Sequence, residues 1–148
     1  SDWSSDVCSS DLKDVTWAIE KIGLADYINS LSEGLYTRIG SSGKKLSGSV
    51  TAKVILARSV VSRPKLLIIN DFSEHISRKD KVKILKFLQD KSNGWTLIIL
   101  SISDDPLLFE SCDKIMLLSA GKVAAQGSYL SLKGNLNFQR LIFRDKLT

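Results

Sequence analysis

Apolar residues follow two different spacings along this chain. In the segment 15–22 they recur every three or four residues, which predicts an amphipathic helix. Further on, continuous apolar runs too short for buried helices appear at 66–69, 97–100 and 115–118. Such runs are typical of parallel strands that are covered on both faces. The pattern therefore predicts helices first and a parallel sheet afterwards.

Two further helices are predicted around the first strand. The segment 24–31 lies between glycines and has helical spacing, and it is expected to form a short helix. Between the first two apolar runs, Ser77 followed by Asp80 is a capping-box pattern at the start of a helix over 78–89. The order strand, helix, strand implies a right-handed crossover and parallel pairing.

The N-terminal segment differs from the regular pattern. Residues 1–12 are rich in Ser and Asp and have no periodic apolar spacing, and they resemble a translated sequencing adapter fused to a truncated reading frame. We expect a non-native or disordered segment there and exclude it from the fold. An ordinary flexible terminus is the alternative. If the segment is foreign, the natural protein continues upstream of Lys13.

The C-terminal third is predicted to form a hairpin and a helix. Gly121 is expected to make a tight turn into the segment 122–125, giving a short antiparallel hairpin with the third apolar run. Helical spacing returns over 136–143, within a terminal helix and tail at 133–148. The folded body is expected to span 13–132.

Composition and charge narrow the class of protein. The chain has 148 residues with 43% hydrophobic content, which is enough to bury a core. Its net charge of +5 permits contact with phosphates or anionic surfaces without identifying either. The basic run at 78–86 alternates with apolar residues and has no aromatic stacking platform, which favours a solvated helix face over a nucleic-acid patch.

Metal, disulfide and membrane signals are sparse. Cys8 and Cys112 are too few for a disulfide scaffold and have no metal-ligand spacing, and the lone His75 cannot make a metal site. A reducing compartment is the simpler interpretation. No apolar segment approaches the roughly 20 residues of a spanning helix, so a membrane would be reached through a partner.

The most informative residues surround the first strand. The sequence Leu-Ser-Gly-Ser-Val at 46–50 is a small-residue turn that opens a helix, and the strand 66–69 ends in Asn70 and Asp71. A helix N-terminus with free N–H groups, followed by a buried strand that delivers an acidic residue, is how several nucleotide-handling α/β proteins build their chemistry.

In this order the residues resemble the ATP-binding cassette of ABC transporters. That family's signature reads Leu-Ser-Gly-Gly-Gln, and its next strand ends in Asp-Glu. The segment 33–43 is similar to the element of exporter-type cassettes that touches the transmembrane subunits. The resemblance covers most of 13–132. It implies an α/β fold, the C-terminal portion of a P-loop NTPase-type cassette, with a parallel sheet core, flanking helices and part of a helical subdomain.

The resemblance implies nucleotide-binding roles for Ser47, Gly48 and Ser49. A γ-phosphate held by a facing cassette would approach the Ser47 hydroxyl and the backbone at Gly48. Ser49 replaces a glycine and Val50 replaces the glutamine, so a weakened contact is expected. Alternatively, Ser47 is merely the N-cap of a helix over 49–61, whose buried stripe would include Val50 and Ala57.

The hydrolytic half departs further from the family. Asn70 stands where an Asp helps to hold Mg²⁺, and Asp71, the catalytic candidate, stands where a Glu polarises the attacking water. Ile102 stands where the family has its switch His, and its side chain cannot donate a hydrogen bond to a phosphate. His75 lies at the wrong place in the sequence to take over that role. No Gly-x-x-x-x-Gly-Lys-Ser/Thr loop occurs, since the segment 41–45 only mimics its composition. Weak or absent hydrolysis is expected, without tight binding of ATP to this chain alone.

The function implied is that of an ATP-binding subunit or domain of an exporter-type ABC transporter, which lends its signature to a partner's ATP site. ATP and Mg²⁺ would be cofactors of the complete assembly. The partners would be a second cassette and transmembrane domains at the cytoplasmic face of the membrane, and no nucleic acid. A catalytically silent scaffold is the alternative, and a nucleic-acid-associated ATPase with the same fold is a third hypothesis.

Overall fold

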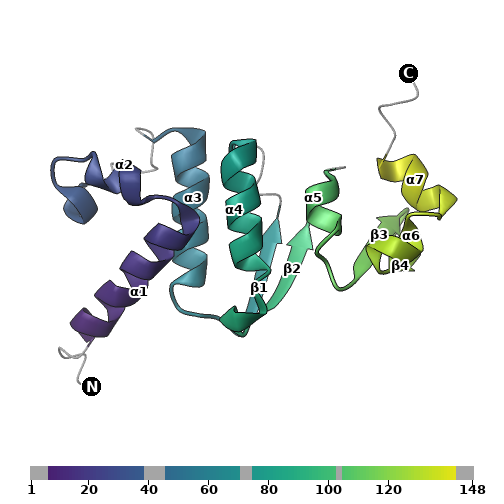
Figure 1. The fold of residues 1–148 in the computed structure, drawn as a ribbon, viewed down its shortest axis with the longest axis horizontal. Helices are drawn as coiled ribbons and strands as arrows, with labels where there is room; N and C mark the ends of the chain where they lie inside the picture. Colours follow the sequence, from purple (N-terminus) through teal and green to yellow (C-terminus); the bar gives the residue numbers. More distant parts are fainter. Residues whose placement is uncertain (1–6, 39–45, 71–74, 103–104, 143–148) are drawn as a thin grey trace. The chain divides into compact units, whose positions relative to one another are not determined.

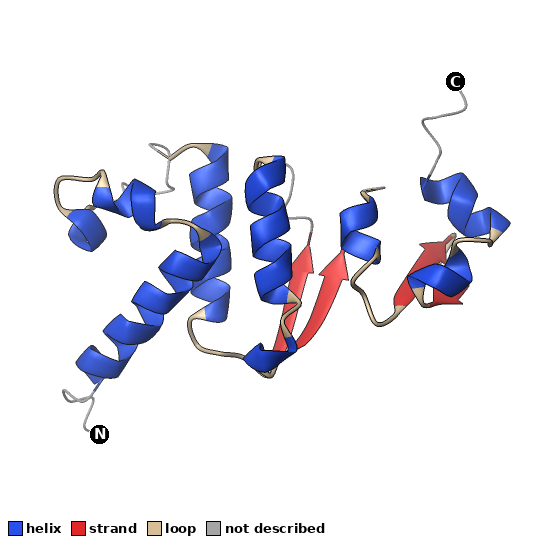
Figure 2. Ribbon diagram, viewed as in Figure 1, coloured by secondary structure: helices blue, strands red, loops and turns tan. Residues whose placement is uncertain are grey.

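The computed structural model divides into two compact units, residues 1–100 and 101–148, which we describe separately. Figure 1 shows the course of the chain and Figure 2 its secondary structure. The residues that the structure describes are 7–38, 46–70, 75–102 and 105–142.

The first unit contains helices and a parallel pair of strands. In chain order its elements are α1 (Val7–Ile22), α2 (Ala25–Asn29), the 3-10 turn η1 (Gly34–Tyr36), α3 (Gly48–Val60), β1 (Leu66–Asn70), α4 (Arg78–Leu88), the 3-10 turn η3 (Lys91–Asn93) and β2 (Thr96–Leu100). The predicted helices over 24–31 and 78–89 are thus confirmed, each with slightly shorter bounds.

Helix α1 begins well before the start predicted at Val15. Residues 7–12 therefore belong to α1. Ala18 and Ile22, each 1% exposed, anchor the helix in the core. Once that part has formed, each preceding residue adds one hydrogen bond without a new nucleation cost, which explains the extension. The foreign origin of the N-terminal segment stays a prediction.

The parallel pairing of the first two predicted strands is confirmed. β1 and β2 pair in register from Leu66 opposite Thr96 to Asn70 opposite Leu100, and α4 lies between them in the sequence. Their carboxyl ends therefore lie at the same edge of the sheet. Asn70, one of the residues singled out from the sequence, ends β1 at this edge.

The prediction that these strands are covered on both faces is wrong for the described residues. Leu67 and Ile69 are buried, whereas Leu66 and Ile68 are 51% and 58% exposed. Successive side chains of a strand point to opposite faces, so β1 packs on one face and leaves the other open. A continuous apolar run does not distinguish coverage on one face from coverage on both, which explains the error.

Helix α3 also buries a different stripe from the one predicted. Its buried residues are Lys53, Leu56, Ala57 and Val60, and of the predicted stripe only Ala57 is among them. The remaining predicted positions, such as Val54, are half-buried. The helix carries apolar side chains on two adjoining faces, so spacing alone did not decide which face packs inward.

The second unit is a hairpin with short helices. Its elements are α5 (Pro106–Phe109), β3 (Ile115–Ser119), β4 (Lys122–Gly127), α6 (Tyr129–Leu132) and α7 (Leu136–Ile142). Gly121 has φ 74°, a left-handed conformation that favours glycine, so the predicted tight turn is confirmed. Leu132 and Phe138 form the buried centre of this unit.

The third apolar run forms the antiparallel hairpin predicted from Gly121, and not the parallel strand that its continuous apolar pattern predicts. β3 pairs with β4 in antiparallel orientation, with Ile115 opposite Gly127 and an irregularity after Leu117. The expectation that this run is a parallel strand is therefore wrong in the described structure. The turn at Gly121 brings the two strands together at a short sequence separation, which makes the antiparallel pairing easy to form. The predicted terminal helix forms as α7, and residue 143 lies outside the described residues.

Candidate functional site

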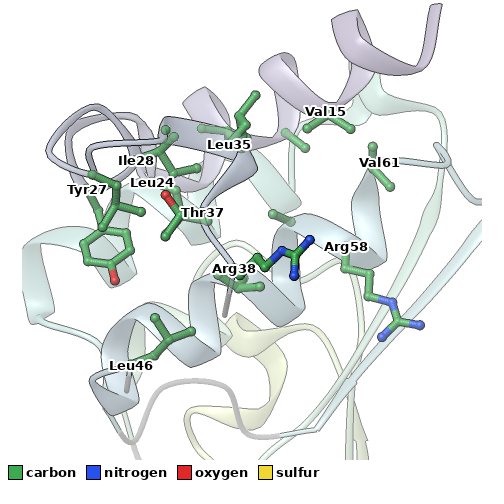
Figure 3. Close-up of a pocket in the computed structure, with 16 residues that line it drawn as sticks. Val15, Leu24, Tyr27, Ile28, Leu35, Thr37, Arg38, Leu46, Arg58 and Val61 are labelled. Atoms are coloured by element: carbon green, nitrogen blue, oxygen red, sulfur yellow. The ribbon is translucent and has the colours of Figure 1, made fainter. Parts of the chain in front are cut away.

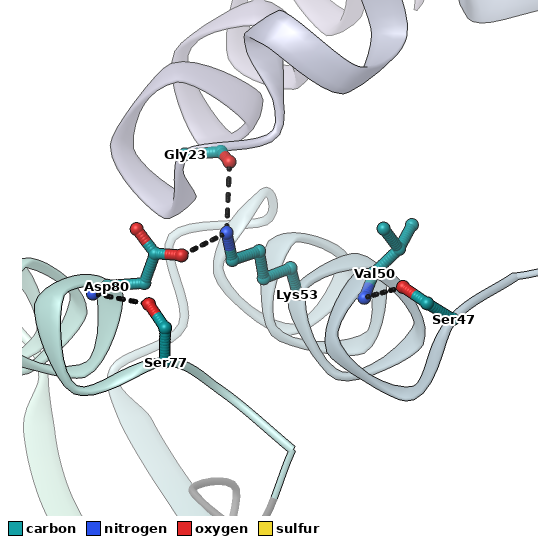
Figure 4. Close-up of polar contacts among 6 residues, drawn as sticks. All are labelled: Gly23, Ser47, Val50, Lys53, Ser77 and Asp80. Atoms are coloured by element: carbon teal, nitrogen blue, oxygen red, sulfur yellow. Dashed lines mark hydrogen bonds and ion pairs between the residues drawn. The ribbon is translucent and has the colours of Figure 1, made fainter.

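The predicted signature residues lie at the amino end of α3. Ser47 precedes the helix in an extended conformation, and its hydroxyl oxygen accepts a hydrogen bond from the backbone N–H of Val50 at 3.3 Å (Figure 4). This is N-cap geometry, so the structural role predicted for Ser47 is confirmed. Ser47 and Gly48 are exposed, while Ser49 is half-buried. The first N–H groups of a helix have no partners within it, so this end can receive an anion.

His75 packs against this helix end, which sequence reasoning did not predict. A methyl group placed on Gly48 would lie 3.0 Å from Cγ and 3.1 Å from Cδ2 of the His75 ring. Any side chain at position 48 must therefore displace the imidazole. The exposure expected for His75 is confirmed, but its setting is not an isolated surface loop. The order of the elements could have predicted this contact. A strand that follows a helix and runs back along it returns the chain to the start of that helix, which is where His75 lies.

A partly buried ion pair fixes the amino half of α3. Lys53 Nζ lies 2.8 Å from Asp80 Oδ2, and the same ammonium donates to the carbonyl oxygen of Gly23 at 3.4 Å (Figure 4). Asp80 stands in the first turn of α4, where its backbone N–H donates to the hydroxyl of the N-cap Ser77. The pair thus ties α3 to α4 and to the end of α1. Spacing predicted the Ser77 cap but gave no sign of Lys53.

The electrostatics of this pair have a clear direction. The hydrogen bond from Lys53 is the main cause that lowers the pKa of Asp80, with a smaller contribution from the Ser77 hydroxyl acting against the effect of burial. Asp80 is therefore ionised at neutral pH and satisfies the Lys53 ammonium, whose side chain is only 11% exposed. A buried charge of this kind is tolerated only with a partner.

The hydrolytic candidates belong to the carboxyl end of β1 and to the segment after β2. Asn70 is the exposed last residue of β1, and Ile102 follows β2 and is 97% exposed. The parallel pairing places Asn70 opposite Leu100, two residues before Ile102 in the sequence. Asp71, the catalytic candidate, lies outside the described residues, so its role stays a prediction. Within the described ranges, no cluster of three or more His, Cys, Asp or Glu residues is arranged to hold a metal ion.

In the part of the chain that the structure describes, none of the helices has both the length and the apolar character needed to cross a bilayer.

Comparison with known proteins defines the relationship of this chain. No family model matches it. A candidate export ATP-binding/permease protein of Rickettsia typhi is 31% identical over 130 residues, which are 88% of this chain and 22% of that protein. The solved structure of a bacterial Atm1-family ABC exporter with ATP bound matches with a TM-score of 0.81 and 26% identity, over 92% of this chain and 24% of that one. This chain is a homologue of exporter-type ABC cassettes.

A second relative is also named as a transporter. Antigen peptide transporter 1 of Rattus norvegicus is 27% identical over 121 residues, which are 83% of this chain and 17% of that protein. The chain therefore spans less than a quarter of the length of the relatives that it matches. The mixed fold with a small parallel sheet agrees with the α/β partial cassette predicted from the sequence.

Proposed function

We propose that this chain is part of the ATP-binding region of an exporter-type ABC transporter and that it contributes its signature segment to nucleotide held by a second cassette. Homology supports the family, and the exposed, capped amino end of α3 supports the contact. Ser47 and Gly48 are the contacting residues in this proposal, with Ser49 beside them.

The physical basis of the contact is the backbone of α3. The helix has 13 residues, so the dipoles of its peptide groups place a partial positive charge at its amino end. The first backbone N–H groups there also lack partners within the helix. The absence of a side chain at Gly48 lets a phosphate approach the backbone closely. The capped, exposed helix start that opens on this glycine is the single observation that carries the proposal.

The chain's own hydrolysis is proposed to be weak or absent. Asn70 keeps an acceptor oxygen but lacks the negative charge that helps to hold Mg²⁺, and Ile102 offers no donor to a phosphate. Asp71 remains the candidate for polarising water, with a side chain one methylene shorter than Glu. ATP and Mg²⁺ would act in the complete assembly, with a second cassette and transmembrane domains as partners at the cytoplasmic face of the membrane.

A catalytically silent scaffold is the second candidate. Ser49 and Val50 favour it, because they replace the glycine and the glutamine of the family signature and so reduce the polar contacts available to a phosphate. In that case the cassette fold would hold an assembly together without nucleotide.

Nucleotide-dependent association separates the two functions. The 148-residue chain is mixed with the intact cassette of the Rickettsia typhi relative, and association is measured by sedimentation with and without Mg²⁺ and ATP. We expect ATP to strengthen association, and Gly48→Asp to remove this gain, because a carboxylate would stand where phosphate approaches. Loss of one charge-assisted contact weakens binding by about 10-fold to 100-fold.

Two variants control for other effects. Gly134→Asp adds the same charge at a glycine with open space around it, and it should leave association unchanged. Gly48→Ala displaces the His75 ring without adding charge, and it should retain most of the ATP dependence. Association that ignores ATP, or that is equally strong in Gly48→Asp, would support the scaffold.

A further inference from the structure

A pocket of about 560 Å³ lies within the first unit and takes its walls from α1, α2, α3 and the segment around η1 (Figure 3). Most of the lining is aliphatic, with Ala18, Ile28, Leu35 and Val54 as examples from the four elements. Its volume falls within the range of about 300–1,000 Å³ that is usual for sites of small organic ligands. Leu46, the first residue of the signature segment, lines the pocket, but the proposed nucleotide contacts Ser47, Gly48 and Ser49 do not.

Few of the lining residues are polar, and the charged ones are all positive. Thr37 and Arg38 follow η1, and Arg58 comes from α3 (Figure 3). None of the lining residues is an Asp or Glu. No ion pair involves either arginine among the described residues. Since an arginine keeps its charge at any ordinary pH, the pocket favours an anion.

Thr37 supplies an independent observation. Its hydroxyl oxygen is buried and has no hydrogen-bond partner among the described residues. A buried hydroxyl without a partner is costly, and a native structure keeps one only for a reason. Because Thr37 lines the pocket, a ligand oxygen that shifts the neighbouring side chains would satisfy it.

We propose that this pocket binds a long-chain anionic amphiphile, of which a fatty-acid carboxylate is the simplest form. The aliphatic wall takes the acyl chain, and the carboxylate accepts hydrogen bonds from the Thr37 hydroxyl and the Arg38 guanidinium. Arg58 adds positive charge. This binding site goes beyond the proposed function and does not depend on it.

The size of the pocket favours an acyl chain over a peptide helix. An α-helix with its side chains is about 10–12 Å across, so 560 Å³ would hold little more than one turn of it. A single flexible acyl chain, by contrast, can lie in such a volume along the whole length of the acyl chain. The charge of the lining excludes a cationic head group, and the unpaired Thr37 hydroxyl favours a head group that accepts hydrogen bonds.

The test uses the 148-residue chain and three probes of equal length. Dodecanoate and dodecyltrimethylammonium are titrated calorimetrically below their micelle concentrations, and dodecanol below its solubility limit. We expect dodecanoate to bind with one-to-one stoichiometry, dodecanol to bind about tenfold more weakly, and the ammonium compound not to bind, because only the carboxylate pairs with arginine.

Matched variants locate the site. Arg38→Gln should weaken dodecanoate binding about tenfold and leave dodecanol unchanged, whereas Arg78→Gln, an exposed position on α4, should change neither. Thr37→Val should weaken dodecanoate binding and also raise the melting temperature of the ligand-free chain, because the unpaired hydroxyl is gone. Val54→Trp should block both probes, with circular dichroism to verify the fold.

Several outcomes would overturn the proposal. Equal affinity for the three probes, or several molecules bound per chain, would indicate adsorption to apolar surface. Unchanged dodecanoate binding in Arg38→Gln would remove the assigned head-group contact. Binding of an acidic amphipathic peptide, or of vesicles that contain phosphatidylglycerol, without binding of dodecanoate would assign the pocket to a protein or to a lipid surface instead.

Discussion

The amino end of α3 is proposed to meet a partner's nucleotide, and the carboxyl edge of the β1–β2 sheet would serve the cassette's own, and the two regions differ in what they have kept. At α3 the cap of Ser47, the exposed helix start and Gly48 are all present. At the sheet edge the strands are in place, but Asn70 and Ile102 do not carry the groups that the family resemblance implies.

The difference follows from how each part is built. A phosphate contact made by backbone N–H groups needs only a helix start, a cap and a small residue, so it persists as long as the helix forms. A hydrolytic centre needs particular side-chain groups, and substitution removes these without changing the fold. The amino half of α3 is also fastened by Lys53 and Asp80, whereas Asn70 and Ile102 are exposed.

The largest expected effect comes from breaking the support of α3. Asp80→Asn leaves the Lys53 ammonium buried without its charged partner, and it should lower the free energy of unfolding by about 2 kcal/mol. This is less than the roughly 3–5 kcal/mol of a fully buried pair, because the Asp80 side chain is 34% exposed. Urea unfolding measures the loss, and Asp26→Asn, at an exposed carboxylate on α2, is the matched control.

The same pair predicts a pH dependence. Because the folded-state pKa of Asp80 is lowered, its contribution to stability is present above the unfolded pKa of about 3.9 and is lost as the pH falls through the lower folded value. The free energies of unfolding of the unsubstituted chain and of Asp80→Asn should therefore differ at pH 6 and converge in strong acid. An equal gap at every pH would show that ionisation of Asp80 is not the source.

A smaller effect is expected where His75 meets Gly48. Gly48→Ala pushes the His75 ring aside, and the cost should stay below about 1 kcal/mol because the ring is exposed and can turn. His75→Ala should remove that cost, so the double variant should be at least as stable as Gly48→Ala alone. A double-mutant cycle by thermal unfolding measures the coupling. Zero coupling would mean that the two residues do not touch.

The smallest effect is expected at the sheet edge. Asn70→Asp and Ile102→His restore the family residues at exposed positions, so each should change the free energy of unfolding by no more than about 0.5 kcal/mol. Neither should give the 148-residue chain measurable ATP turnover, because its sequence has no phosphate loop. A coupled-enzyme assay for ADP checks this. Steady turnover in either variant would contradict the claim that the sheet edge of this chain cannot support hydrolysis on its own.

Local spacing predicted the elements well but not their surroundings. The strands over 66–69 and 97–100, the Ser77 cap and the turn at Gly121 each depend on a few neighbouring residues, and each was confirmed. The open face of β1 and the buried stripe of α3 depend on which segments pack there, and no local pattern records that.

The same distinction applies to the candidate site. The order of motifs placed the helix start and the sheet edge correctly, because topology fixes both. The contact of His75 with Gly48 and the pairing of Lys53 with Asp80 join residues 27 apart in the sequence, and they became visible only with the side chains in place. Asp71 remains a prediction from the family resemblance alone.

The most direct measurement is ATP turnover by an intact partner cassette, titrated with this chain and with two of its variants. If the signature is kept and the hydrolytic edge is lost, the chain should raise the partner's turnover, Gly48→Asp should abolish the increase, and Asp71→Ala should leave it unchanged. An increase that survives Gly48→Asp, or that disappears in Asp71→Ala, would contradict the account.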